Sequence, residues 1–354
     1  MISPTVIGLA RCPDCRGPLA NQADALVCGR CGRRAIKGDG YLDLRPSETF
    51  TEQTRYLDEA LHGDARHETV SPALLQAGVR QWMLRRFLQP APGDVIVDLG
   101  CGSGRSLVWN HASGAAMIGI DVAPYFAREA LAQADLVLGD LRRLPFADGA
   151  FTKAYALDVF EHLSREALAA VLAEIARVVQ PGGQVFVYSH VRRNSRLALG
   201  LRGINRLARG LERLGLIDLR QERLRKADHL NPLADVPDLE QVVGEAGFRI
   251  ARIRYYTPLV GAFVENILMR MAERALGRTA AARSSATSHF AATEDAAHEA
   301  RLARTAAKRR LASGGVLYYA LAGVTQVMTL DVRVFGRVRS GPFFALLERT
   351  AAAR

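Results

Sequence analysis

The stretch VIVDLGCGSG, residues 95–104, constrains the fold of this chain more than any other segment. A short aliphatic run ends at Asp98, and glycines follow at positions 100, 102 and 104. Such runs are typical of buried parallel strands, and closely spaced glycines let a main chain pass near a ligand at the strand's carboxyl end. The spacing differs from the G-x-G-x-x-G of dinucleotide folds, and a carboxylate before the turn favours a cationic ligand. Glycine-rich turns also occur where two backbones merely cross, so the loop needs support from the residues that follow it.

Three further predicted strands end in acidic residues at regular strand–helix spacing. The segment MIGIDVAP ends a strand at Asp121, whose carboxylate can accept hydrogen bonds from both hydroxyls of a ribose. The segment DLVLGD leads to Asp140, which is placed to meet an adenine amino group, with the Leu141 amide alongside. The segment FTKAYALDVFEHL delivers Asp158 to the same edge. One such carboxylate would usually be a helix cap or a solvated turn residue, but the four together predict a site for S-adenosylmethionine.

Residues 75–256 resemble the class I S-adenosylmethionine-dependent methyltransferases of the type 11 group. The resemblance is carried, in order and spacing, by VDLGCGSG, GIDVAP, GDLRRLPFADGAF, LDVFEHL and RVVQPGG. It implies an enzyme with an α/β fold: a doubly wound, seven-stranded, mostly parallel sheet whose last strand is antiparallel. It also implies that the cofactor is contacted by Asp98, Gly100, Cys101, Gly102, Gly104, Asp121, Asp140, Leu141 and Asp158.

Four of the five cysteines lie within twenty residues, as two C-x-x-C pairs: Cys12 with Cys15, and Cys28 with Cys31. Four thiolates at this spacing can close a tetrahedron around zinc, and a closed site is structural and not catalytic. A pair of redox or incidental cysteines is the alternative. The segment LARCPDCRGPL…LVCGRCGRRAIKGDGYLDLRP also resembles the zinc ribbons of bacterial methyltransferases, in particular the head of the ribosomal-RNA guanine-N1 methyltransferases.

Two histidines follow the fourth and fifth predicted strands and are the candidate catalytic bases, His162 and His190. The sulfonium of the donor is already a good leaving group, so a base matters only where the acceptor holds its proton tightly. A structural turn residue at His162 and a loop residue at His190 are the alternatives. Tyr188 is expected to pack within its strand.

A basic insertion, residues 190–236, follows the fifth predicted strand. Residues 190–230 hold eleven arginines or lysines against four acidic residues. Spacings of three or four predict a helix with an apolar stripe and arginine flanks, the stripe being Leu197, Leu201, Ile204, Leu207, Leu211 and Leu214. A substrate lid, a lipid-surface helix, an RNA backbone clamp and a solvated basic face all fit this pattern. In the turn after it, Asp228, His229 and Asn231 are placed to face the pocket.

A second helical insertion is predicted over residues 257–340, before a last strand in residues 341–354. Its centre, 280–300, is rich in Ala, Ser and Thr without an apolar stripe, which predicts a flexible loop. Residues 312–330 carry no charge and reach the lower limit of a transmembrane length, but glycine, threonine and glutamine dilute them. A helix packed on its neighbour is therefore expected, with peripheral membrane or lipid contact open. The remaining boundaries are a zinc ribbon at 1–46, a linker at 47–74 and the methyltransferase core at 75–256.

The whole chain has 354 residues and a formal net charge of +11, which favours nucleic acid, an anionic membrane surface or acidic substrates as partners. The first residues do not read as a secretory signal, so a cytoplasmic setting is expected. The leading hypothesis is methyl transfer to a small or amphipathic metabolite under a helical lid. An RNA base methyltransferase is the alternative, although the basic residues lie beside apolar stripes and not among aromatics that stack on unpaired bases. A non-catalytic binding partner that retains the fold is the alternative from another class.

Overall fold

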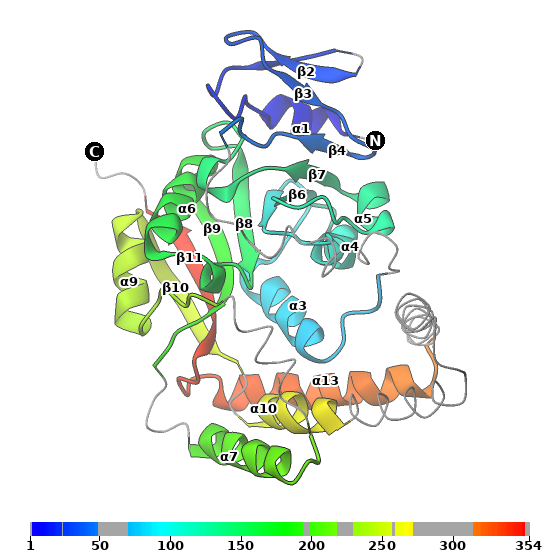
Figure 1. Ribbon diagram of the computed structural model, residues 1–354, viewed down its shortest axis with the longest axis vertical. Coiled ribbons are helices and arrows are strands. Elements are labelled where there is room, and N and C mark those ends of the chain that lie inside the picture. The colour runs from blue at the N-terminus through cyan, green and yellow to red at the C-terminus, as the bar shows by residue number, and fades with distance from the viewer. Residues whose placement is uncertain are drawn as a thin grey trace, which may run out of the picture.

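A computed structural model gives the fold of the chain (Figure 1). It describes residues 2–22, 24–48, 70–193, 199–217, 229–256, 259–271 and 314–350. The flexible loop expected at 280–300 and most of the expected linker at 47–74 lie outside these residues.

An eight-stranded sheet forms the centre of the molecule, in the order β10-β11-β9-β8-β5-β6-β7-β4. Neighbours from β9 to β4 are parallel, whereas β11 is antiparallel to both β9 and β10. The predicted α/β fold with an antiparallel last strand is therefore confirmed, and one further strand, β4, joins it. The strands are β4 (Tyr41–Asp43), β5 (Val95–Leu99), β6 (Ala116–Asp121), β7 (Asp135–Leu138), β8 (Phe151–Leu157), β9 (Val179–His190), β10 (Phe248–Tyr255) and β11 (Pro342–Arg349).

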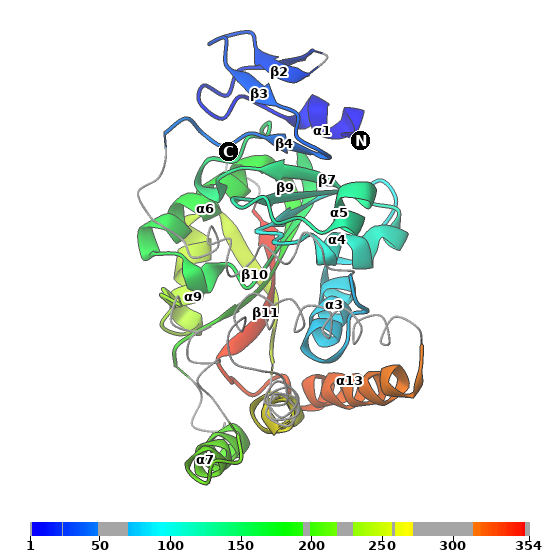
Figure 2. The same ribbon diagram turned by 45° about the vertical axis from the view of Figure 1, so that its right-hand side comes forward.

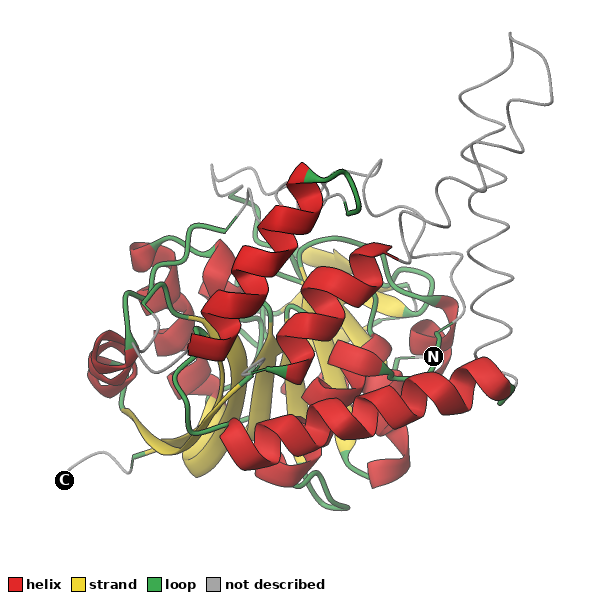
Figure 3. Ribbon diagram, turned by 90° about the horizontal axis from the view of Figure 1, so that it is seen from below, coloured by secondary structure: helices red, strands yellow, loops and turns green. Residues whose placement is uncertain are grey.

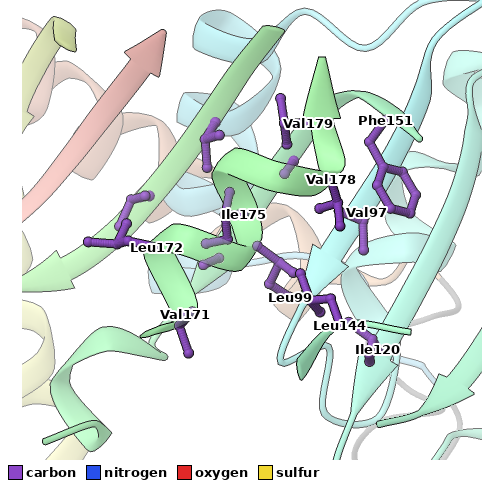
Figure 4. Close-up of a cluster of buried hydrophobic side chains, with 14 of the residues drawn as sticks. Val97, Leu99, Ile120, Leu144, Phe151, Val171, Leu172, Ile175, Val178 and Val179 are labelled. Carbon is purple, nitrogen blue, oxygen red and sulfur yellow. The ribbon is translucent and has the colours of Figure 1, made fainter. Parts of the chain in front are cut away.

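Helices cover both faces of this sheet because its strands are apolar on both sides. One face carries α6 (Arg165–Val178) and α9 (Val236–Glu245), and the other carries α3 (Leu75–Leu88), α4 (Arg105–Asn110) and α5 (Arg128–Gln133). Alternation along β5 sends Val97 and Leu99 to the first face and Ile96 to the second. Figure 4 shows α6 side chains lying against Val97 and Leu99.

The stretch SPALLQ predicts a helix with Ser71 as its N-cap and Pro72 at its first position, but α3 starts later. The helix begins at Leu75, with Leu74 at a cap position that makes no side-chain hydrogen bond. The Leu75 N–H instead donates to Oγ1 of Thr325, 2.7 Å away. Because Thr325 lies on α13 (Val316–Phe335), a helix distant in sequence supplies the N-cap hydrogen bond that was expected from Ser71.

The amino-terminal segment comprises α1 (Pro4–Leu9), a small antiparallel sheet and β4. The small sheet has β1 (Leu19–Asn21), β2 (Ala25–Cys28) and β3 (Arg34–Ile36). Strand β4 pairs with β7 in parallel register, so the segment covers that edge of the main sheet (Figures 1 and 2). Two further backbone hydrogen bonds, Arg11 N to Pro145 O and Ala147 N to Leu9 O, fasten it to the loop before β8.

A layer of helices lies below the strand ends, as Figures 1 and 3 show. It contains α7 (Leu199–Arg213), α10 (Val260–Phe263) with the π-helical turn Val264–Leu268, and α13. These elements leave or enter the sheet at its carboxyl edge, since α7 follows β9, α10 follows β10, and α13 precedes β11. We call residues 199–217, 259–271 and 314–341 the cap. In the part of the chain that the structure describes, no helix is both long and apolar enough to cross a membrane.

The apolar stripe predicted for α7 is confirmed at Leu201, Ile204 and Leu211 and is wrong at Leu207 and Leu214. Leu201 and Ala208 are buried and Ile204 packs beside them, whereas Leu207 and Leu214 are exposed. Ala208 lies in a cluster with Ile217 and Ile267, so a small residue occupies the place expected of Leu207. Leu197 lies outside the described residues.

Candidate functional site

The glycine loop and the end of β6 meet at the carboxyl edge of the sheet. The carboxylate of Asp121 accepts the Gly102 N–H through Oδ2 at 2.8 Å and the Ala123 N–H through Oδ1 at 3.0 Å. Main-chain bonds from Gly100 N and Cys101 N to Ile120 O hold the two loops together. The structure thus places Asp121 directly beside the loop, as the sequence-based expectation requires.

The glycines of the loop serve two different purposes. At Gly100, φ is +72° and a Cβ would lie 2.7 Å from Cγ2 of Val159, so both conformation and packing require glycine. At Gly102, φ is +54° and a Cβ would meet nothing within 4 Å. Open space above Gly102 is where a ligand can approach the main chain.

Asp98 and Cys101 lie under this loop. Asp98 is buried at 2% exposure, and burial raises the pKa of its carboxyl to about 8, with a further contribution from the negative charge of Asp121. Burial likewise raises the pKa of the Cys101 thiol well above its usual value, aided by Asp121 and Asp98. A thiol held protonated is a poor nucleophile, so Cys101 is suited to packing within the loop and not to covalent chemistry.

Asp140 is engaged within its own loop. It caps the 3-10 turn Leu141–Arg143 by accepting the Arg142 N–H at 2.8 Å, and it pairs with the Arg142 guanidinium at 2.8 Å. The Leu141 N–H begins this turn, where helical geometry supplies no acceptor for it. Asp140 and Leu141 therefore follow β7 as predicted, with Arg142 as an additional cation that the sequence did not single out.

Asp158 adopts a left-handed conformation, with φ of 57°, directly after β8. Its carboxylate forms an ion pair with Arg80 of α3, and that guanidinium lies 4.3 Å from the ring centre of Tyr188. Burial raises the pKa of Asp158 to about 6, although Arg80 acts in the opposite direction. Sequence reasoning missed Arg80, because nothing in the expected helix distinguishes it from its neighbours.

Three histidines and a buried glutamate gather beside Asp158. Nδ1 of His190 lies 3.2 Å from Oε1 of Glu161, whose other oxygen accepts the Ser189 hydroxyl at 2.7 Å. Burial alone would raise the pKa of Glu161, but His190 and Ser189 lower it to about 2. The rings of His162 and His229 are 4.7 Å apart in an edge-to-face contact.

The turn after the first insertion closes this group of side chains. The Asn231 N–H donates to the carbonyl of Glu161 at 2.9 Å, which brings His229 next to His162. The structure brings His229 and Asn231 of this turn beside the candidate base His162, while Asp228 lies outside the described residues. The sequence did not reveal the role of Glu161. Its contact with His190 forms only when the ends of two different strands, β8 and β9, lie side by side in the fold.

The four cysteines of the amino-terminal segment form a second cluster. Their Sγ atoms all lie within 4.8 Å of one another. The separations are 3.6 Å for Cys12 and Cys31, 3.4 Å for Cys15 and Cys28, and 3.5 Å for Cys15 and Cys31. Sulfur atoms on a zinc tetrahedron lie about 3.8 Å apart, because each Zn–S bond is about 2.3 Å long. The donor set and its spacing therefore fit a zinc ion.

Comparison with known proteins finds similar sequences for this part of the chain. Residues 97–187 match the sequence model of the family described as "Methyltransferase domain". A probable tRNA methyltransferase 9B of Mus musculus is 31% identical over 138 residues, which are 37% of this chain and 30% of that protein. A demethylmenaquinone methyltransferase of Mycolicibacterium vanbaalenii is 36% identical over 133 residues, 35% of this chain and 56% of the relative. A 24-methylenesterol C-methyltransferase 2 of Oryza sativa subsp. japonica is 32% identical over 116 residues, 30% of this chain and 31% of the relative.

The relatives match this chain over only part of their own length. The chain spans from about a third to about half of the length of the three relatives. The residues that match the family model contain β6, β7, β8 and most of β5 and β9, together with the glycine loop and the acidic residues near the strand ends. Over residues 97–187 the chain is therefore similar to a methyltransferase domain.

Proposed function

We propose that this protein transfers a methyl group from S-adenosylmethionine to a small or amphipathic metabolite by direct displacement. The observation that supports the proposal most strongly is the meeting of two sets of side chains at one sheet edge. Asp98, Asp121 and the loop at Gly102 suit the donor, and the group of histidines beside Glu161 suits an acceptor.

The residues present fit the donor on physical grounds. The open space above Gly102 gives room for a ligand against the main chain. Asp98 is buried with a pKa raised to about 8, and none of the ion pairs among the described residues engages it. A cationic ligand beside Asp98 would offset the cost of ionising it. Asp121 would hold the ribose, and Asp140 with the Leu141 amide would hold the adenine. When bound, the donor supplies an electrophilic methyl group on a sulfonium.

Orientation is the main contribution required of the protein, and it can lower a barrier by roughly 7–11 kcal/mol. The cap lies over the carboxyl edge and would exclude water from the acceptor. Where the acceptor holds its proton tightly, His190 would take it, and Glu161 would position His190 and stabilise the imidazolium. His162 packs against His229 and is the second candidate base.

RNA is the second candidate acceptor, supported by the similarity to a probable tRNA methyltransferase and by the exposed arginines of α7. Purified protein, S-adenosylmethionine labelled on the methyl group, and a cell extract separated into lipid, small-molecule and RNA fractions distinguish the two. We expect label in the lipid or small-molecule fraction, with little dependence on salt. Label confined to RNA, with binding that falls steeply as salt rises, would contradict the proposed acceptor class.

A base can be tested in the same assay. His190→Asn should lower the rate about 10²- to 10⁴-fold for an acceptor that must lose a proton. His111→Asn, on the 3-10 turn His111–Ser113 after α4, is a matched control that should keep the wild-type rate. An unchanged rate in His190→Asn would assign catalysis to positioning alone.

The amino-terminal segment is proposed to hold one structural zinc ion through Cys12, Cys15, Cys28 and Cys31. We propose the same domain limits as those expected from sequence: a ribbon at 1–46, a core at 75–256 with an insertion at 190–236, a second insertion at 257–340 and a terminal strand in 341–354. A cytoplasmic protein with peripheral membrane contact fits these parts.

A further inference from the structure

The outer surface of the cap is unusually apolar for a helical layer. Sixteen large hydrophobic side chains are exposed among the described residues, and all but Ile36 and Leu230 lie in the cap. Isolated exposed hydrophobic residues are ordinary, whereas a concentration of them on one layer marks an interaction surface.

Helix α13 shows this arrangement most clearly because it is apolar on two faces. Its inner face buries Thr325, Met328 and Val332, the last two within the core under α3. Its outer face carries a stripe at spacings of three and four: Val316, Tyr319, Gly323, Val327, Leu330 and Val334. Leu330 is 56% exposed and Val334 is 59% exposed, so neither side chain is needed for packing within the chain.

The exposed charged side chains of the cap are all positive. The exposed arginines of α7 lie at positions 202, 206, 209 and 213, which places them on one side of that helix. Arg333, Arg337 and Arg339 add exposed positive charge around the end of α13. The cap has three acidic residues, and none is exposed: Asp331 is buried, and Glu212 and Glu265 are half-buried.

From these two features we infer that the cap docks on the surface of an anionic phospholipid membrane. Apolar side chains of α13 would enter the boundary between headgroups and acyl chains, and the arginines would meet lipid phosphates. Nucleic acid would match the positive charge of the cap. It would not bury the apolar stripe of α13, because its phosphate backbone is hydrated. The inference concerns an interaction surface and does not depend on methyl transfer.

Vesicle flotation with the full chain tests this inference. We expect binding to phosphatidylcholine vesicles that contain about one third phosphatidylglycerol, weak binding to phosphatidylcholine alone, and partial release as salt rises, with an apolar remainder that stays bound. A triple change of Arg206, Arg209 and Arg213 to Gln should weaken binding about fivefold for each arginine removed. Changing Val327, Leu330 and Val334 to Gln should abolish the binding that survives high salt. Ile36→Gln on β3 and Arg249→Gln at the far end of β10 are matched controls that should bind as wild type does.

Several outcomes would overturn the inference. The first is that the folded full chain, checked by circular dichroism, does not bind to anionic vesicles. Equal binding by the cap variants and the wild type is another. Binding of RNA that the arginine changes abolish and the apolar changes leave intact, without vesicle binding, would assign the surface to nucleic acid.

Discussion

Nδ1 of His190, at the end of β9, lies 3.2 Å from Oε1 of Glu161, which follows β8 and is 1% exposed. The pair connects two neighbouring strands at the edge where the acceptor is proposed to bind. It also makes the stability of the fold depend on pH.

Glu161 should stabilise the protein at neutral pH and lose that effect in acid. Its pKa is lowered to about 2 from 4.5, so the unfolded chain binds a proton more readily than the folded chain does. The stabilisation is complete above about pH 4.5 and is lost as pH falls towards 2. Urea unfolding of Glu161→Gln at neutral pH should show a loss of about 3 kcal/mol that shrinks in acid. Glu166→Gln, in the first turn of α6, is the control, and an equal loss at both pH values would contradict the assignment.

Asp98 should couple cofactor binding to pH in the opposite sense. Its pKa is raised to about 8 from 3.8, so below pH 8 the folded protein holds a proton that a cationic ligand would displace. Affinity for S-adenosylmethionine should therefore rise with pH up to about 8, in excess of any change intrinsic to the ligand. Calorimetry on the wild type and on Asp98→Asn separates the two contributions. The same pH dependence in both proteins would show that Asp98 does not face the ligand.

The cysteine cluster should bind about one zinc ion per chain, since four thiolates close one tetrahedral site. Changing Cys28 and Cys31 to serine should remove the metal. It should also loosen β4, which follows β1–β3 in the same small segment, and so speed hydrogen exchange at β7 amides. Cys101→Ser, in the glycine loop, should keep the full zinc content. Zinc retained by the double variant would contradict the site.

Thr325 should contribute to stability by holding the cap to the core. Its Oγ1 accepts the Leu75 N–H and donates to the Leu321 carbonyl, both at 2.7 Å. Thr325→Ala removes the hydrogen bond at the N-terminus of α3 and should cost about 0.5–2 kcal/mol of unfolding free energy. Thr325→Ser keeps the hydroxyl and should cost less. Denaturant unfolding compares the two variants. Equal losses would mean that the methyl group, and not the hydrogen bond, matters.

Most of the sheet was predictable because β5, β6, β7 and β8 are short, largely apolar runs that end near an acidic residue at regular spacing. Those local patterns place Asp98, Asp121, Asp140 and Asp158 at one edge without knowledge of tertiary contacts. The spacing of the two C-x-x-C pairs predicts the cluster of four cysteines for the same reason.

Features that depend on contacts between distant segments could not be read from the sequence. The hydrogen-bond acceptor at the N-terminus of α3 is Thr325, 250 positions away from Leu75, and the ion-pair partner of Asp158 is Arg80, 78 positions away. Strand β4 has only three residues, which is too few for a recognisable strand pattern in the sequence, so the eighth strand was not predicted. In the stripe of α7, the place predicted for Leu207 is taken by Ala208, because only the tertiary contact with Ile267 shows that Ala208 faces inward.

The central claim is that this sheet edge binds S-adenosylmethionine, and titration calorimetry tests it directly. We predict one binding event per chain for the folded wild type, and affinity at least about tenfold lower for Asp121→Asn, because a charge-assisted hydrogen bond contributes about 1.5–3 kcal/mol. Asp148→Asn, whose side chain is 81% exposed on the loop before β8, should bind as tightly as the wild type. Absence of binding by the folded wild type, or wild-type affinity in Asp121→Asn, would contradict the account.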